Sequence, residues 1–315
     1  MTRHALPNAL LALATALAAL TADAAGTRTH VSNAGSDANT AFSCDFAHPC
    51  RTFAAALAQT TPGGEILAVD SGGFGKLVID RSVAIIAAPG AFAGIGVGAG
   101  GNATGVEIAT PGVDVVLRGL TLTGQGGDYG IHMTAGNSLT IEDCVVSGFS
   151  GAARYGARIA AAAGVRITRS VFRGNDYGVE LNAGATAAIA ESSFLGGSTV
   201  SIYVLGTTGT TTTAAVSDTL VADGSIGIGT YILPAGAAGK ISITRSTIVN
   251  NSFIGVLSQS SAGTSEVTLG GSMVSGSSWG LRRIPGVGGA VLQTLGDNLV
   301  TENGSSNLVT SLPPG

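Results

Sequence analysis

Two short sequence patterns recur along the chain with the same spacing, and this repetition restricts the possible folds more than any other feature. The first pattern is an aliphatic residue, two variable residues and a small residue. Its copies are LRGL, IEDC, ITRS, IAES, VSDT, ITRS, LGGS and LGDN, which begin at residues 117, 141, 167, 189, 216, 243, 269 and 295. A second pattern alternates with it: TGVEI at 104, YGIHM at 129, YGARI at 155 and YGVEL at 177, with weaker copies VSIYV, IGVLS and WGLRR at 200, 254 and 279.

Two interlocked patterns with one period indicate a single structural unit repeated along an axis. Apolar residues alternate with other residues inside each unit, which predicts strands rather than helices. The composition agrees, because 49 glycines among 315 residues and only 11% charged residues suit short strands joined by tight turns. The regular leucine and asparagine ladder of a leucine-rich repeat is absent. The sequence therefore predicts an all-β solenoid of parallel coils stacked ~4.8 Å apart.

The repeats resemble those of the right-handed parallel β-helix superfamily, the pectate-lyase-like fold, and in particular its bacterial secreted members, over about residues 65–310. The stretch PCRTFAAALAQTTPGGEILAVDSGGFG is similar to the N-terminal segment of such proteins, which implies a short amphipathic capping helix over residues 51–59. Such a cap has a physical reason, because the open end of a solenoid exposes strand edges and apolar core. The resemblance implies a single-stranded right-handed β-helix but no one activity, since the superfamily includes lyases, hydrolases, esterases, epimerases, adhesins and phage spikes.

The N-terminus has the features of an export signal. Arg3 and His4 precede an apolar run over residues 6–20, and an Ala-Asp-Ala cleavage site follows at residues 22–24. We expect a signal peptide at 1–24, an N-terminal loop and capping helix at 25–64, the β-helix at 65–310 and a tail at 311–315. No later stretch is apolar enough for a transmembrane helix. The mature protein is therefore predicted to be secreted, extracellular or periplasmic, without a membrane span.

The three cysteines fit an oxidising compartment. Cys44 and Cys50 lie six positions apart in the loop-like stretch FSCDFAHPCRTF, and we predict a disulfide between them. A metal site is the alternative, but only His48 is nearby to complete it. Cys144 occupies a position that holds serine or threonine in other repeats, so we expect it to be buried and unreactive.

Several classes of function are disfavoured. The net charge is −4 with 15 lysines and arginines, so no basic face for nucleic acid is predicted. The catalytic motifs of polygalacturonases, pectin methylesterases, calcium-dependent pectate lyases and mannuronan epimerases are not found, nor are G-x-S-x-G, a P-loop, H-E-x-x-H or C-x-x-C. Four histidines in the whole sequence argue against a histidine-rich metal site. We predict no cofactor and no metal.

Aligned repeats convert single residues into columns that run along the solenoid. One column is mostly charged with alternating sign, which predicts an exposed ladder of ion pairs: Asp143, Arg169, Glu191, Asp218, Arg245 and, further on, Asp297. The next column is small and mildly polar, as expected where a corner needs hydrogen bonds: Cys144, Ser170, Ser192, Thr219, Ser246, Ser272 and Asn298. A third column is aromatic: Tyr129, Tyr155, Tyr177 and Trp279. Either it forms a sugar-stacking platform or it packs in the core or at a corner, and its alternation with inward positions favours the second.

A fourth column is predicted to face outward from one sheet: Glu107, His132, Arg158, Glu180, Tyr203, with Tyr231 in a less certain register, then Leu257 and Arg282. This mixture is similar to the saccharide grooves of β-helix enzymes. For elimination from a uronate, His132 would take the proton and Arg158 would neutralise the carboxylate, while Glu107, Glu180 and Tyr203 would bind the sugar. A glycosidase pair is less natural, because Glu107 and Glu180 lie three coils apart, ~14 Å, beyond the ~9.5 Å limit for such pairs. A solvated face of mixed charge is the alternative.

Three functions remain open from the sequence. The first is a secreted β-helix that binds polysaccharide or another cell-surface polymer. The second is a polysaccharide lyase or glycoside hydrolase whose active site uses the outward column. The third is a structural or adhesive surface protein in which the solenoid is a spacer.

Overall fold

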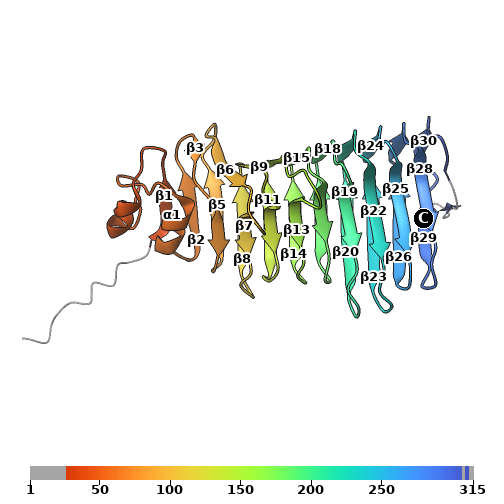
Figure 1. Ribbon diagram of the computed structural model, residues 1–315, viewed down its shortest axis with the longest axis horizontal. Coiled ribbons are helices and arrows are strands. Elements are labelled where there is room, and N and C mark those ends of the chain that lie inside the picture. The colour runs from red at the N-terminus through yellow and green to blue at the C-terminus, as the bar shows by residue number, and fades with distance from the viewer. Residues whose placement is uncertain (1–25, 307–308, 312–315) are drawn as a thin grey trace, which may run out of the picture.

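Each repeat folds into one coil of three short strands, and the coils stack along a single axis (Figure 1). The computed structural model describes residues 26–306 and 309–311. The predicted signal peptide at 1–24 lies outside these described residues, as does most of the predicted tail. The strands form three parallel sheets, which confirms the predicted right-handed parallel β-helix. About nine turns of the solenoid stack, one more than the repeats counted in the sequence.

The strands of each sheet come from successive coils. The twelve-stranded sheet contains β1 (Gly26–Val31), β2 (Thr60–Ala68), β5 (Val83–Ala87), β8 (Asp114–Arg118), β11 (Ser138–Glu142), β14 (Gly164–Thr168), β17 (Thr186–Ala190), β20 (Thr211–Ser217), β23 (Ala238–Thr244), β26 (Thr264–Gly270), β29 (Ala290–Thr294) and β31 (Thr310–Ser311). The ten-stranded sheet contains β3 (Gly72–Gly73), β6 (Ala93–Gly98), β9 (Leu120–Gln125), β12 (Val145–Ser147), β15 (Val171–Arg173), β18 (Ser193–Leu195), β21 (Leu220–Ala222), β24 (Thr247–Val249), β27 (Met273–Ser275) and β30 (Leu299–Thr301).

The nine-stranded sheet carries the second sequence pattern. Its strands are β4 (Leu77–Ile79), β7 (Thr104–Ile108), β10 (Tyr129–Met133), β13 (Tyr155–Ile159), β16 (Tyr177–Leu181), β19 (Val200–Leu205), β22 (Ile226–Ile232), β25 (Ile254–Ser260) and β28 (Trp279–Ile284). Strands β4 to β16 have five residues or fewer, whereas β19 to β28 have six or seven. The later coils are therefore wider across this sheet.

The interior is filled by the aliphatic residues of the first pattern. Ile141, Ile167 and Ile189 lie directly above one another in the strand register, and each is fully buried. Phe172 and Phe194 stack inside with their ring centroids 5.0 Å apart. The last copy of the pattern departs from this column, because Leu269 pairs with Thr294 and leaves Leu295 exposed. Every coil thus contributes to one axial core, whose burial is the main favourable contribution to folding.

The N-terminal end is closed by a short helix, as predicted. Helix α1 (Phe53–Gln59) begins after Thr52, whose hydroxyl accepts a hydrogen bond from the Ala55 amide. A 3₁₀ helix, η1 (Asp37–Phe42), precedes it, and the Cys44–Cys50 disulfide is formed as predicted. Strand β1 lies before the cap in sequence but pairs with β2, so the twelve-stranded sheet begins well before residue 65. Among the described residues, no helix has the length and apolarity that a membrane crossing requires.

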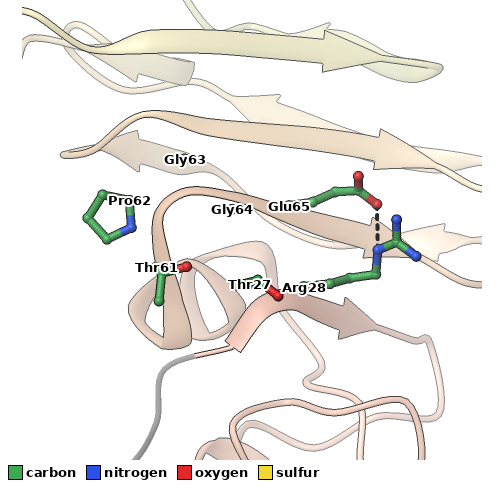
Figure 2. Close-up of a pocket in the computed structure, with 7 residues that line it drawn as sticks. All are labelled: Thr27, Arg28, Thr61, Pro62, Gly63, Gly64 and Glu65. Carbon is green, nitrogen blue, oxygen red and sulfur yellow. Dashed lines mark ion pairs between the residues drawn. The ribbon is translucent and has the colours of Figure 1, made fainter.

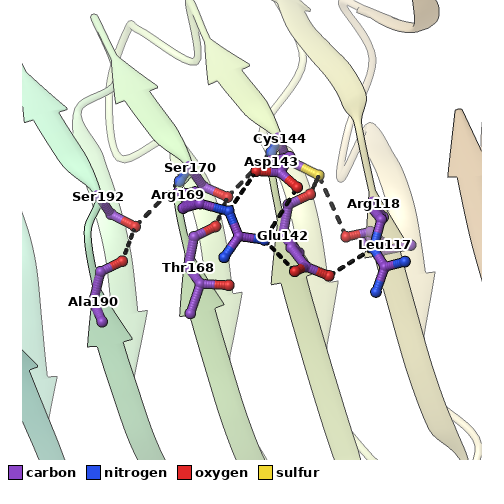
Figure 3. A network of polar contacts seen from close by, with 10 residues as sticks. All are labelled: Leu117, Arg118, Glu142, Asp143, Cys144, Thr168, Arg169, Ser170, Ala190 and Ser192. Carbon is purple, nitrogen blue, oxygen red and sulfur yellow. Dashed lines mark hydrogen bonds and ion pairs between the residues drawn. The ribbon is translucent and has the colours of Figure 1, made fainter. Parts of the chain in front are cut away.

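The corner between the twelve- and ten-stranded sheets uses a left-handed residue in coil after coil. The charged column occupies this position with φ between 46° and 53°: Asp143, Arg169, Glu191, Asp218 and Arg245. A non-glycine residue there costs ~1 kcal/mol or more. Two pairs of coil neighbours form as predicted, Asp143–Arg169 at 2.9 Å and Asp218–Arg245 at 2.7 Å, whereas Glu191 and Asp297 form no ion pair among the described residues. Figure 3 shows Arg169 also reaching Glu142. The exposed pairs contribute only ~0 to 1 kcal/mol each.

The small polar column satisfies the backbone at the same corner. The Ser170 hydroxyl accepts a hydrogen bond from the Cys144 amide at 3.1 Å and donates to the Thr168 carbonyl at 2.9 Å (Figure 3). Ser192 repeats this arrangement one coil further on. Cys144 is buried and carries a free thiol, and burial raises its pKa to about 12. These contacts confirm the predicted corner stack and the inert packing of Cys144.

A carboxylate in the interior column should unfold the protein or nearly so. We expect Ile167→Asp to lower the free energy of unfolding by more than about 4 kcal/mol, because it buries an unpaired charge. Arg166→Asp, one residue earlier on the exposed face of β14, is the matched control and should change stability by about 1 kcal/mol or less. Urea unfolding of both variants measures the difference, and equal midpoints would contradict this inward register.

Candidate functional site

The predicted outward column forms one line across the nine-stranded sheet. Glu107 pairs with His132, His132 with Arg158, Arg158 with Glu180 and Glu180 with Tyr203. Five successive coils therefore place these residues along a strip ~19 Å long. We call this line, with the tyrosines described next, the tyrosine strip. The column continues through Gly229 rather than Tyr231, because Tyr203 pairs with Gly229 and Tyr231 pairs with Leu205.

The aromatic column also lies on this outer face, which corrects the prediction that it packs inside. Tyr129, Tyr155, Tyr177 and Tyr203 are partly exposed and stack in sequence, with ring centroids 4.7 to 5.8 Å apart. Burial in the stack raises the pKa of Tyr155 to about 12, and the negative charge of Glu180 is the second cause of this increase. The phenol of Tyr155 therefore stays protonated at neutral pH and can donate a hydrogen bond.

The glycine after each tyrosine explains why strict alternation failed. In β10 and β13 the burial pattern has two consecutive buried residues, the glycine and the residue after it. A side chain at Gly130 would lie 2.4 Å from the Gly156 carbonyl oxygen, and one at Gly156 would lie 2.6 Å from the Gly178 oxygen. The backbone thus packs against the next coil at this point, and the preceding tyrosine turns outward. The aromatic residues face the same side as the outward column three positions later.

Arg158 and Glu180 form a close ion pair within the strip. The Arg158 Nε lies 2.8 Å from a Glu180 carboxylate oxygen, and the Glu180 side chain is only 3% exposed. The Arg158 guanidinium carbon also lies 5.2 Å from the centroid of the Tyr155 ring. Glu180 therefore lies below the surface and holds Arg158 in place, Tyr129 also bonds the guanidinium, and the remaining guanidinium N–H groups are further donors.

His132 is half-buried beside Tyr129. The two rings stack with centroids 4.3 Å apart and nearly parallel planes. Burial lowers the pKa of His132, the Arg158 charge lowers it further, and the Glu107 carboxylate partly opposes this shift. The imidazole is therefore neutral at pH 7 and can accept a proton or a hydrogen bond.

The N-terminal end of the strip opens into a cleft of about 340 Å³. Its lining includes Glu107, Thr104, Lys76, Val78 and Asn102. Lys76 makes no ion pair with any described residue. The sequence did not single out Lys76, because β4 has three residues and carries no copy of the repeat pattern.

A second depression, of about 500 Å³, lies at the N-terminal edge of the twelve-stranded sheet (Figure 2). Thr27, Arg28 and residues 61–65 line it. Arg28 pairs with Glu65 at 2.9 Å, so its charge is already neutralised. The depression is formed by β1 and β2 and shares no residue with the tyrosine strip. We therefore treat the strip as the candidate site.

The described residues contain no group of three or more histidine, cysteine, aspartate or glutamate side chains placed to hold a metal ion. The candidate site is therefore an open strip of phenols, one imidazole and one neutralised ion pair on a parallel β-solenoid. This combination offers hydrogen-bond donors and acceptors along a line rather than an enclosed pocket.

Comparison with known proteins places this solenoid in a family. The family model of the right-handed β-helix region matches residues 102–278, more than half of the chain, so the chain belongs to that family. Among solved structures, it is similar to pectate lyase Pel9A with a TM-score of 0.65 and 13% sequence identity, over 91% of this chain and 78% of that one. This similarity establishes a shared fold. A search of curated proteins finds no match.

The pKa of His132 should respond to its two charged neighbours in opposite directions. We expect NMR titration to give a value below the ordinary 6.5, raised by Arg158→Gln and lowered further by Glu107→Gln. Since the folded state disfavours the imidazolium, protonation of His132 should reduce stability as pH falls below about 6.5. The resonance is assigned by its loss in His132→Ala. A pKa above 6.5, or shifts of the opposite sign, would contradict the placement of His132.

Proposed function

We propose that this is a secreted β-helix protein that binds a polysaccharide along the tyrosine strip. The observation that carries the proposal is the stack of four tyrosines. All five tyrosines of the sequence lie on the nine-stranded sheet, and four of them form one continuous line. Stacked rings cover one another's faces, so a ligand meets their edges and hydroxyls. A line of phenols that both donate and accept hydrogen bonds suits a polymer rich in hydroxyl groups.

The charged members of the strip fit binding. Glu107 is a partly exposed carboxylate and accepts hydrogen bonds from sugar hydroxyls. Arg158 offers its Nη donors to the same polymer, and Glu180 fixes the orientation of Arg158 from below. Tyr203 ends the stack, and burial raises the pKa of its phenol. The rigid spacing of the coils presents these groups without the entropy cost of ordering a loop.

The similarity in fold to a pectate lyase supports a polysaccharide ligand. In open β-solenoids a sheet face can take an extended polymer across several coils, and five coils give a path of ~19 Å. A structural or adhesive role remains the alternative if no polysaccharide binds.

Removing single phenol hydroxyls tests the proposal without breaking the stack. We expect Tyr155→Phe and Tyr177→Phe each to weaken binding to the preferred polymer by about 3- to 10-fold, as loss of a net hydrogen bond predicts. Affinity is measured by calorimetry after screening acidic and neutral polysaccharides. Thr213→Val removes a hydroxyl from the outer face of the twelve-stranded sheet and should leave affinity unchanged. Equal affinities of all three variants and the parent protein would refute the strip as the binding site.

Elimination from a uronate polymer is a second candidate, favoured by the neutral state of His132. In that reaction the imidazole removes the C5 proton next to the carboxylate, and Arg158 stabilises the resulting charge through its guanidinium N–H groups. The C4–C5 double bond then forms as the C4–O glycosidic bond breaks, and the leaving oxygen takes a proton from water. The same polymers are therefore followed for absorbance of the unsaturated product. Activity should increase with pH through the pKa of His132 and disappear in His132→Ala and Arg158→Ala. Binding without an increase in this absorbance would support binding as the function and argue against elimination.

Secretion is supported by the Cys44–Cys50 disulfide, since such bonds persist in oxidising compartments. The predicted export signal supports the same location. N-terminal sequencing of protein collected outside the cytoplasm should begin at or near Ala25. Mature protein that still begins at Met1 would argue against export through a cleaved signal.

A further inference from the structure

An aromatic residue followed three positions later by an arginine occurs twice on the nine-stranded sheet. In β13, Arg158 lies over the Tyr155 ring. In β28, the Arg282 guanidinium carbon lies 4.8 Å from the centroid of the Trp279 ring. The register places Arg282 in the same column as Arg158, five coils further along.

Arg282 has a second aromatic support that Arg158 lacks. Phe253, just before β25, lies under the same guanidinium with its ring centroid 5.3 Å from the guanidinium carbon. Phe253 is 44% exposed. Two rings from neighbouring coils thus hold the guanidinium at the surface, and the cation–π contacts favour this position.

The two arginines differ in what neutralises them. Arg158 pairs with Glu180 of the next coil at 2.8 Å. Arg282 pairs with no carboxylate among residues 26–306 and 309–311. Its neighbour in the preceding coil is Leu257, an apolar side chain that is 4% exposed. The same motif is therefore satisfied internally at Arg158 and carries an uncompensated charge at Arg282.

We propose that Arg282, supported by Trp279 and Phe253, is an anion-binding subsite that takes a carboxylate or sulfate group of the bound polymer. A guanidinium binds such groups with two parallel hydrogen bonds, and flat aromatic support fixes its plane. The Arg158–Glu180 pair illustrates a carboxylate bound to this motif within the same protein. This inference rests on the proposed function and narrows its ligand to an anionic polysaccharide.

The subsite lies on the path that the strip defines. From Tyr203 the column passes through Gly229 and Leu257 to Arg282, three coils or ~14 Å further along. Neither intervening residue carries a charge or a long side chain that would block a polymer. A chain bound along the tyrosines reaches Arg282 by extending over these three coils.

Trp279 provides a direct probe, because it is the single tryptophan of the sequence. Its fluorescence is titrated with an oligogalacturonate, with the same oligomer after reduction of its carboxyl groups, and with a sulfated galactan oligomer of equal length. We expect a saturable change with the carboxylated or sulfated oligomer, and the comparison shows which anion is preferred. Arg282→Gln should weaken that binding by about tenfold or more, as expected for a charge-assisted hydrogen bond. Arg282→Lys keeps the charge but not the planar guanidinium, so its affinity should lie between those of the parent protein and Arg282→Gln.

Arg173→Gln is the matched control, because Arg173 is exposed on β15 of the ten-stranded sheet and has no ion pair among the described residues. Equal titrations of Arg282→Gln and Arg173→Gln, or no response of Trp279 to either anionic oligomer, would overturn the subsite. A different outcome is that calorimetry shows binding of the carboxyl-reduced oligomer, and that Tyr155→Phe but not Arg282→Gln weakens this binding. That result would keep the proposed function and reject the anionic ligand. A fluorescence response that depends on Arg282 but not on Tyr155 or Tyr177 would keep the subsite as an anion site and reject the tyrosine strip.

Discussion

Parallel pairing of each strand with its counterpart in the next coil is the constraint on which the rest of the structure depends. It sets residues one repeat apart directly against each other at ~4.8 Å. Each side chain therefore has to fit the residues at the same position in the coil before it and the coil after it. Isoleucine stacks on isoleucine inside, serine hydroxyls bond the amide of the neighbouring coil at the corner, and Asp218 meets Arg245 outside. The candidate site is a further product of the same rule, since Tyr129, Tyr155 and Tyr177 stack because they occupy one register position.

Because the repeat spacing is visible in the sequence, the columns could be predicted, including the line from Glu107 to Tyr203. Two features could not be obtained by extending simple alternation. The glycine after Tyr129, Tyr155 and Tyr177 packs against the next coil, which turns the tyrosines outward. In the stretch IGIGTYIL two glycines could match the repeat, and the register selects Gly227, which places Gly229 rather than Tyr231 in the column. The first error arises from backbone contacts between coils, which a single-coil pattern does not contain, and the second from two glycines that fit the repeat equally well.

The sequence also could not predict how deeply each group is buried. Glu107 and Glu180 occupy equivalent positions, yet Glu107 faces a cleft and Glu180 is covered and paired. The difference comes from neighbours: Glu180 lies between Arg158 and Tyr203, whereas Glu107 lies between Val78 and His132. A buried carboxylate beside an arginine loses hydration and gains a close partner, so the two residues act as one neutral unit. Removal of either partner would leave an unpaired charge, which makes this pair important for the shape of the strip.

The distribution of charge favours binding as the primary role of the strip. A catalytic cation must be free to stabilise charge that develops in the reaction, but most of the charge of Arg158 is already balanced by Glu180. The neutral His132 keeps the capacity of a base, yet it lies in a line of aromatic rings rather than in an enclosed and water-excluding pocket. Uncompensated charges occur instead at the two ends, Lys76 beside the cleft and Arg282 on its aromatic support. A neutral, hydroxyl-lined middle with charged ends is suited to align an extended polymer, because the middle accepts any hydroxyl-rich segment while the ends restrict which groups can lie there.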